Sequence, residues 1–87
     1  MSLPSSSFRL VTAPQLGQLL VAARKRCKLT QAQVGHRVSL SQNRISYLEK
    51  NPADISFEQL LVWSAAVGLE LRLGERDTGK LHNEPEW

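Results

Sequence analysis

The chain has 87 residues, of which 41% are hydrophobic and 22% are charged, and its net charge is +3. This length makes one small domain, and the composition is ordinary for a folded, water-soluble protein. No apolar run approaches the roughly 20 residues that span a bilayer, and no signal peptide is evident, so we expect a cytoplasmic protein. The one cysteine, Cys27, excludes an internal disulfide and fits a reducing compartment.

Charge is distributed unevenly along the chain. Residues 24–50 hold seven basic side chains and one acid, a net charge of +6. Residues 51–87 hold three basic side chains and seven acids, a net charge of −4. The basic middle of the chain therefore suits a polyanionic partner such as DNA.

Four helix starts can be recognised from their capping residues. Three have a hydroxyl residue followed three positions later by glutamine, which predicts a capping box: Thr12 with Gln15, Thr30 with Gln33, and Ser56 with Gln59. Each is flanked by apolar residues spaced for a hydrophobic staple, namely Val11 with Leu16, Leu29 with Val34, and Ile55 with Leu60. The fourth start, Ser41, lacks the glutamine but has the staple of Leu40 with Ile45.

These starts predict an all-α domain. The expected helices cover residues 13–27, 31–38, 42–50 and 57–67. Asn51 and Pro52 should stop the third helix, and Gly68 should end the fourth as its C′ residue. On the fourth helix the spacing of Phe57, Leu60, Leu61, Ser64 and Val67 predicts one common face, and Trp63 should lie in the core or in a dimer contact.

A strand is expected directly after the last helix, because Leu69, Leu71 and Leu73 alternate with polar residues. One strand cannot pair with itself, so the simplest partner is the same strand in a second copy of the chain. The predicted organisation is a lead-in at 1–11, a helical domain at 12–68, a dimerisation strand at 69–73 and a flexible tail at 74–87.

Residues 30–50 predict a helix-turn-helix unit. Their apolar positions would form one shared inner face, made by Val34, Val38, Leu40, Ile45 and Leu48. Gly35 lies where the two helices should approach most closely, so a small residue is required there. Such a unit places the start of its second helix in the major groove of DNA.

Polar side chains gather at that start. The expected base contacts are Ser41, Gln42, Asn43, Arg44 and Ser46, because amide and guanidinium groups pair with adenine and guanine edges. Gln42, Asn43 and Ser46 are the best candidates, and Arg44 could serve a base or a phosphate. The expected phosphate contacts are Lys28, Gln31, Arg37, Tyr47 and Lys50. The alternative for each residue is an ordinary solvated polar surface.

Glu49 is the one acid in the basic segment and ends the second helix of this unit, where the helix dipole disfavours it. A partner is therefore expected, and Arg24 is the best candidate; the alternative is an unpaired surface carboxylate. His36 and His82 lie far apart in the sequence, so no metal site is expected. No nucleophile–base pair or Gly-rich phosphate loop is present, and we expect neither catalysis nor a cofactor.

The chain resembles the Xre/Cro-type helix-turn-helix family over about residues 16–67. The matching residues are Arg24, Thr30, Gln31, Val34, Gly35, Leu40, Ser41, Gln42, Ile45, Ser46 and Glu49. It also resembles, more narrowly, the HipB-type antitoxins. That likeness rests on Phe8, the Thr12 cap, the Asn51 and Pro52 stop, the strand after the last helix, and the terminal Glu86 and Trp87.

The resemblance implies a lambda-repressor-like fold of four or five helices and a homodimer whose strands pair. It further implies binding to inverted-repeat operators, repression of its own operon in the nucleoid, and neutralisation of a HipA-type serine/threonine kinase toxin. Trp87 would anchor the tail in the toxin, or it is an incidental terminal residue. The alternative function is a stand-alone, phage-like regulator without a toxin. Ser39 departs from the glycine usual in the turn and must accept a positive φ.

Overall fold

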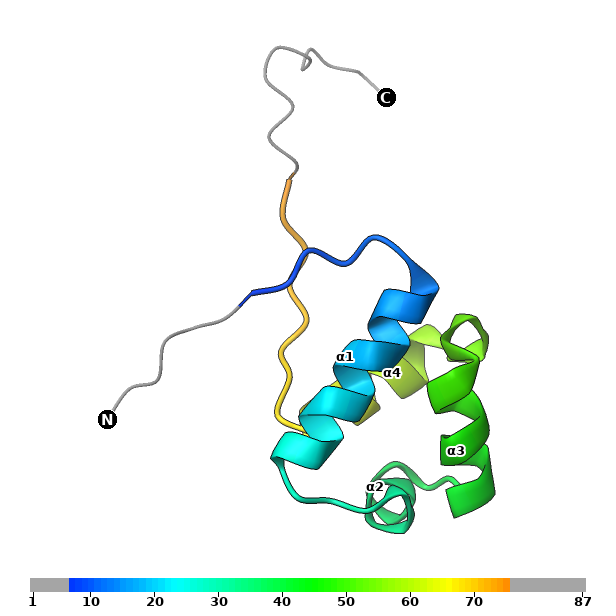
Figure 1. Cartoon of the computed structure of the whole chain (residues 1–87). Helices are drawn as coiled ribbons and strands as arrows, with labels where there is room; N and C mark the ends of the chain where they lie inside the picture. Colours follow the sequence, from blue (N-terminus) through cyan, green and yellow to red (C-terminus); the bar gives the residue numbers. More distant parts are fainter. Residues whose placement is uncertain (1–6, 76–87) are drawn as a thin grey trace, which may run out of the picture.

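The computed structural model of the chain describes residues 7–75. It contains α1 (Ala13–Arg26), α2 (Gln31–Val38), α3 (Gln42–Lys50), the short 3-10 helix η1 (Pro52–Asp54) and α4 (Phe57–Ala66) (Figure 1). The predicted all-α class is confirmed, as are the bounds of α2 and α3. The predictions for α1 and α4 are one residue too long. The sequence predicts only a stop at Pro52, whereas the structure adds a helical turn there.

The local caps explain most of these boundaries. Thr30 and Ser56 form complete capping boxes, in which each hydroxyl accepts an N–H and each glutamine returns to the cap. At Thr12 the predicted box is wrong. The Thr12 hydroxyl accepts from Gln15 N, but the Gln15 side chain instead binds the Val11 N–H and the Arg9 carbonyl. Val11 is 71% exposed, so the predicted staple is absent there too.

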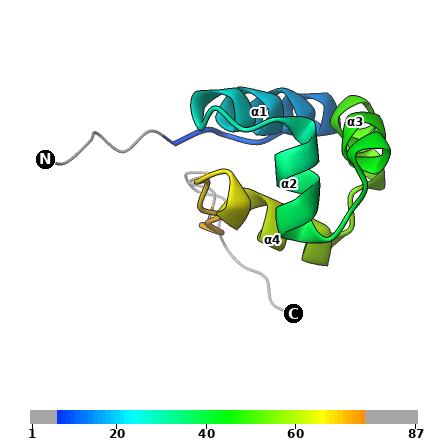
Figure 2. The ribbon, with the colours of Figure 1, turned by 90° about the horizontal axis from the view of Figure 1, so that it is seen from below.

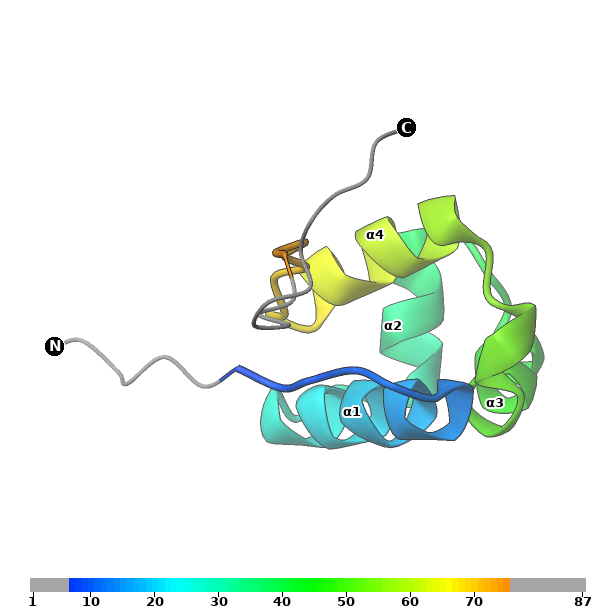
Figure 3. The same cartoon turned by 90° about the horizontal axis from the view of Figure 1, so that it is seen from above.

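The helices surround one small core. Figures 2 and 3 show α1 and α4 on opposite sides, α2 between them and α3 at one end. All four contribute side chains that are fully or almost fully buried: Leu20, Ala23, Val34, Ile45, Leu48, Trp63 and Val67. The predicted inner face of the helix-turn-helix unit is therefore confirmed at its buried positions. None of the described helices has the length and apolar character that crossing a membrane requires.

The inward face of α4 differs from the predicted one. Trp63 and Ser64 are buried, and Leu60 packs against the core. Phe57 and Leu61, which the spacing assigns to the same face, are 70% and 44% exposed. Because the apolar residues of α4 surround the helix, their spacing alone could not tell which ones α2 covers.

The chain leaves α4 through a left-handed residue. Gly68 has φ +79°, as expected for a C′ glycine, and the Leu69 N–H donates to the Ser64 carbonyl at 2.8 Å. Leu69 packs against the core, whereas Leu71 is 40% exposed and Leu73 is fully exposed. Within residues 7–75 the segment has no strand partner, and its pairing across a dimer stays a prediction. The tail beyond residue 75, including His82 and Trp87, lies outside the described residues.

Candidate nucleic-acid interface

The turn between α2 and α3 is set by a close contact and a left-handed residue. A Cβ atom on Gly35 would collide with the carbonyl oxygen of Leu40, so only glycine fits there. Ser39 adopts φ 63° and ψ 41°, the positive φ that the sequence requires of it. The Leu40 N–H donates to the Gly35 carbonyl at 2.8 Å and closes the turn. The strain at Ser39 costs about 1 kcal/mol.

The turn presents the first residues of α3 to solvent. Ser41 caps the helix by accepting from Arg44 N at 3.0 Å, which uses its side chain. Gln42, Asn43 and Arg44 are exposed, and Ser46 is half-buried. Ile45 and Leu48 lie in the core on the other side. The predicted base-contacting side chains therefore share the outer face of α3, and their contact with bases stays a prediction.

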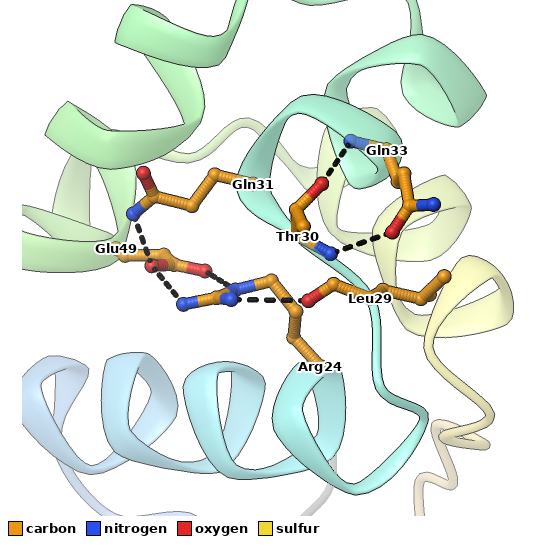
Figure 4. Close-up of polar contacts among 6 residues, drawn as sticks. All are labelled: Arg24, Leu29, Thr30, Gln31, Gln33 and Glu49. Carbon is orange, nitrogen blue, oxygen red and sulfur yellow. Dashed lines mark hydrogen bonds and ion pairs between the residues drawn. The ribbon is translucent and has the colours of Figure 1, made fainter.

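A buried ion pair joins α1 to the end of α3 (Figure 4). Arg24 Nε lies 2.7 Å from Glu49 Oε2, and Arg24 Nη2 lies 3.2 Å from Glu49 Oε1. Arg24 Nη1 also donates to the Leu29 carbonyl at 3.1 Å. The two side chains are only 12% and 5% exposed, and the forked geometry fixes α3 in direction as well as in position.

Gln31 belongs to the same network. Its Nε2 donates to Glu49 Oε1 at 2.9 Å, so the amide predicted to contact a phosphate is bound to a carboxylate instead (Figure 4). This correction follows from proximity, because Glu49 accepts at both of its oxygens and draws the start of α2 to the end of α3. The N–H groups of the first turn of α2 remain the predicted phosphate contact on this helix.

α1 also approaches α3 closely through its backbone. A Cβ atom on Gly17 would lie 2.8 Å from the Glu49 carbonyl oxygen and 3.0 Å from Pro52 Cγ. Real Cβ atoms essentially never approach a carbonyl oxygen this closely. Gly17 is therefore required for the packing of α1 on the last turn of α3, a role that the sequence analysis missed.

Two predicted phosphate contacts are engaged within the chain. Arg37 Nη1 donates to the Ala66 carbonyl at 3.2 Å and so ties α2 to the end of α4. The Tyr47 hydroxyl donates to Asp54 Oδ2 at 2.5 Å, across the turn formed by η1. Neither bond was predicted, although Asp54 is the first acid after Glu49 and could have been paired with Tyr47. Lys28 and Lys50 are exposed, and their phosphate contacts stay predictions.

The environment of Tyr47 changes its acidity. Its hydrogen bond to Asp54 raises the pKa of the hydroxyl, and the negative charge of Asp54 raises it further. The Arg44 guanidinium, 5.2 Å from the centroid of the Tyr47 ring, acts in the opposite direction. The net effect keeps Tyr47 protonated and donating. Within residues 7–75, no three His, Cys, Asp or Glu side chains lie together as metal ligands would.

This arrangement of an exposed polar helix, a closed turn and a fixed second helix defines a helix-turn-helix protein. The family model for the helix-turn-helix domain matches residues 20–73, so the chain belongs to this family. The chain is similar to the antitoxin HigA1 of two Mycobacterium tuberculosis strains, with 33% identity over 75 residues in each case. The match covers 86% of this chain and 50% of the relative, so the chain spans about half the length of these relatives.

The comparisons confirm the predicted relationship to Xre-type helix-turn-helix antitoxins. They do not test the narrower likeness to HipB-type antitoxins, because the relatives found are of another named type. The elements of the matched region, residues 20–73, include the turn, all of α3 and the exposed Leu71 and Leu73.

Proposed function

We propose that the chain is a DNA-binding antitoxin that represses its own operon. The observation that carries this proposal is the outer face of α3, where Gln42, Asn43 and Arg44 are exposed together beside a closed turn. An isolated domain gains nothing from this concentration of amide and guanidinium groups. In the major groove the same groups pair with adenine and guanine edges.

In this proposal the polar residues divide into two functions. Gln42, Asn43 and Ser46 contact bases, together with Arg44, and Ser41 mainly caps the helix. Lys28 and Lys50, with the backbone N–H groups at the start of α2, contact phosphates. Gln31, Arg37 and Tyr47 act first through the internal bonds that hold α2 and α3 in place.

The functional unit that we propose is a homodimer on an inverted repeat. Leu71 and Leu73 are exposed on residues 69–73, and Phe57 and Leu61 are exposed on α4. Large apolar side chains left in water favour burial against a partner. Pairing of residues 69–73 between two copies would satisfy their backbone groups as well. Two copies of α3 would then contact half-sites about 34 Å apart.

The antitoxin part of the proposal is supported by the name of the relatives. The partner implied by the family resemblance is a HipA-type serine/threonine kinase, which Trp87 would contact. Co-expression of the full chain with the product of the adjoining gene tests this part, and a stable complex is expected. If the chain binds its operator but the adjoining product neither binds nor is toxic, the chain is a stand-alone regulator.

DNA binding is tested by selecting duplexes from a randomised double-stranded library with the full chain. An inverted repeat should emerge, and Gln42→Ala should lose about 1–3 kcal/mol of discrimination at one position of each half-site. Binding should also weaken steeply with salt, because phosphate contacts release counterions. Unchanged sequence preference in the variant would contradict the assignment of Gln42, and the absence of any selected duplex would overturn DNA recognition.

A further inference from the structure

Three side chains form a connected row at the C-terminal part of α3 and the turn after it. The Arg44 guanidinium lies 5.2 Å from the centroid of the Tyr47 ring, and the Tyr47 hydroxyl donates to Asp54 Oδ2. Arg44 and Tyr47 are three residues apart, so they share one face of the helix. Asp54 belongs to η1 and reaches this face only because the chain reverses at Pro52.

The far end of this row is fixed to the domain. Pro52 is buried, and η1 is closed by bonds from the Asp54 N–H to the Asn51 carbonyl and from the Ile55 N–H to the Pro52 carbonyl, at 3.0 and 3.1 Å. Ile55 packs against the core. Asp54 is thus a fixed acceptor, whereas Arg44 is a long, exposed side chain that would otherwise sample many rotamers.

We propose that Asp54 is a positioning residue for base recognition: it fixes the Tyr47 ring through the hydroxyl, and the ring holds Arg44 for guanine. The proposal rests on the DNA-binding function proposed above. It assigns to Asp54, an acid, a place in the recognition of a polyanion, and it gives Tyr47 a function other than contact with phosphate.

The geometry suits this function because a guanidinium has two separate binding surfaces. Its face stacks on an aromatic ring, while the N–H groups at its edge donate to the O6 and N7 atoms of guanine. An arginine held flat on Tyr47 therefore keeps its edge for a base. Ordering one such side chain in advance removes a cost that binding would otherwise include, and that cost corresponds to about 2- to 10-fold in affinity.

The test compares variants of the full chain on the selected duplex and on duplexes changed at each base pair. Asp54→Ala should reduce discrimination at one guanine position about 2- to 10-fold, and Tyr47→Phe, which keeps the ring, should do the same. The double variant should lose no more than either single variant, because both act through one bond. Asp54→Asn keeps an acceptor and should retain most of the discrimination.

Glu58→Ala is the matched control, since it removes one exposed acidic charge from α4 without touching this row. If Asp54 acted only as a negative charge, both variants would strengthen binding to all duplexes alike. A loss at one guanine position in Asp54→Ala, absent in Glu58→Ala, supports positioning. Equal behaviour of the two variants overturns it.

A second measurement needs no DNA. Tyr47 is the one tyrosine of the chain, so the tyrosinate absorbance in an alkaline titration reports this residue alone. The pKa of Tyr47 should lie above its ordinary value in the natural chain and fall toward that value in Asp54→Ala. An unchanged pKa in that variant would overturn the contact on which the inference is built.

The two tests separate the possible failures. A chain that shows the expected titration but selects no duplex overturns the proposed DNA binding and, with it, this inference. A chain that binds its selected duplex with the same discrimination after Asp54→Ala overturns the positioning of Arg44 alone.

Discussion

Residues 30–50 and residues 69–73 differ in how completely one chain satisfies them. In residues 30–50 each helix start is capped, the turn is closed by a backbone bond, and Ile45 and Leu48 are fully buried. In residues 69–73 only Leu69 packs against the core, while Leu71 and Leu73 face water. The first region is finished within one chain, whereas the second gains its missing contacts only from another molecule.

This difference indicates which region folds by itself and which depends on concentration. The helix-turn-helix unit should keep its geometry in a dilute monomer, because its stabilising contacts are intramolecular. Residues 69–73 should become ordered as a strand only when a second copy supplies hydrogen bonds. Each of the following predictions breaks or sharpens this contrast, beginning with the largest expected effect.

Glu49→Ala should break the finished region most severely. It leaves Arg24 buried without its carboxylate and releases Gln31, so the free energy of unfolding should fall by about 3 kcal/mol. Urea denaturation followed by circular dichroism measures this loss. Glu70→Ala is the control, because Glu70 and Arg72 are about 80% exposed and their nearest charged atoms lie 4.0 Å apart. It should change stability by less than about 0.5 kcal/mol, and equal losses would contradict the assignment.

Leu71→Asp combined with Leu73→Asp should act on the unfinished region alone. The dimer should dissociate at least about 10-fold more readily, because apolar burial between the copies is lost. Sedimentation at several concentrations measures this change. The helical content of the monomer should be unaffected, because both side chains are exposed in the single chain. A dimer of unchanged affinity would remove residues 69–73 from the interface.

Ser39→Gly should stabilise the finished region by about 0.5–1 kcal/mol, because glycine adopts the observed φ of 63° without a Cβ penalty. Thermal and urea unfolding both measure the gain. Ser39→Ala serves as the comparison and should give no gain, since alanine keeps the Cβ atom. A stabilising alanine together with a neutral glycine would contradict strain in the turn.

The smallest expected effect is a pH dependence at the edge of the finished region. Folding raises the pKa of Tyr47 above its ordinary value of about 10, since its hydroxyl donates to Asp54. The folded state therefore favours the protonated form. The resulting stability is complete below about pH 10 and is lost as pH rises through the folded-state pKa. The stability difference between the natural chain and Tyr47→Phe should shrink between about pH 8 and pH 11, and a constant difference would contradict it.

Features decided within a few residues could be predicted from the sequence. The starts at Thr30, Ser41 and Ser56 follow from short-range hydrogen bonds, and so do the bounds of α2 and α3. Where two local bonds compete, the same rule failed. At Thr12 the Gln15 side chain binds the backbone of the lead-in instead of closing the box, and the sequence does not say which bond wins.

Features decided by the packing of distant elements were less accessible. The sequence suggested Arg24 for Glu49, because one acid in a basic segment has few possible partners, and the structure joins them. It did not show that Gln31 shares that carboxylate or that Arg37 reaches Ala66, because helix crossings decide both contacts. The contact of Tyr47 with Asp54 depends on the turn at η1, which capping rules and periodicity do not predict.

Gly17 gives the domain a mechanical property that no base-facing residue controls. Its hydrogen atom is all that separates the backbone of α1 from the last turn of α3 and from Pro52. α1 therefore works as a rest against which α3 leans, and the size of one side chain sets its tilt. A larger residue there would change how far the tip of α3 projects while leaving every contact group in place, so insertion depth and chemical preference can evolve separately in this molecule.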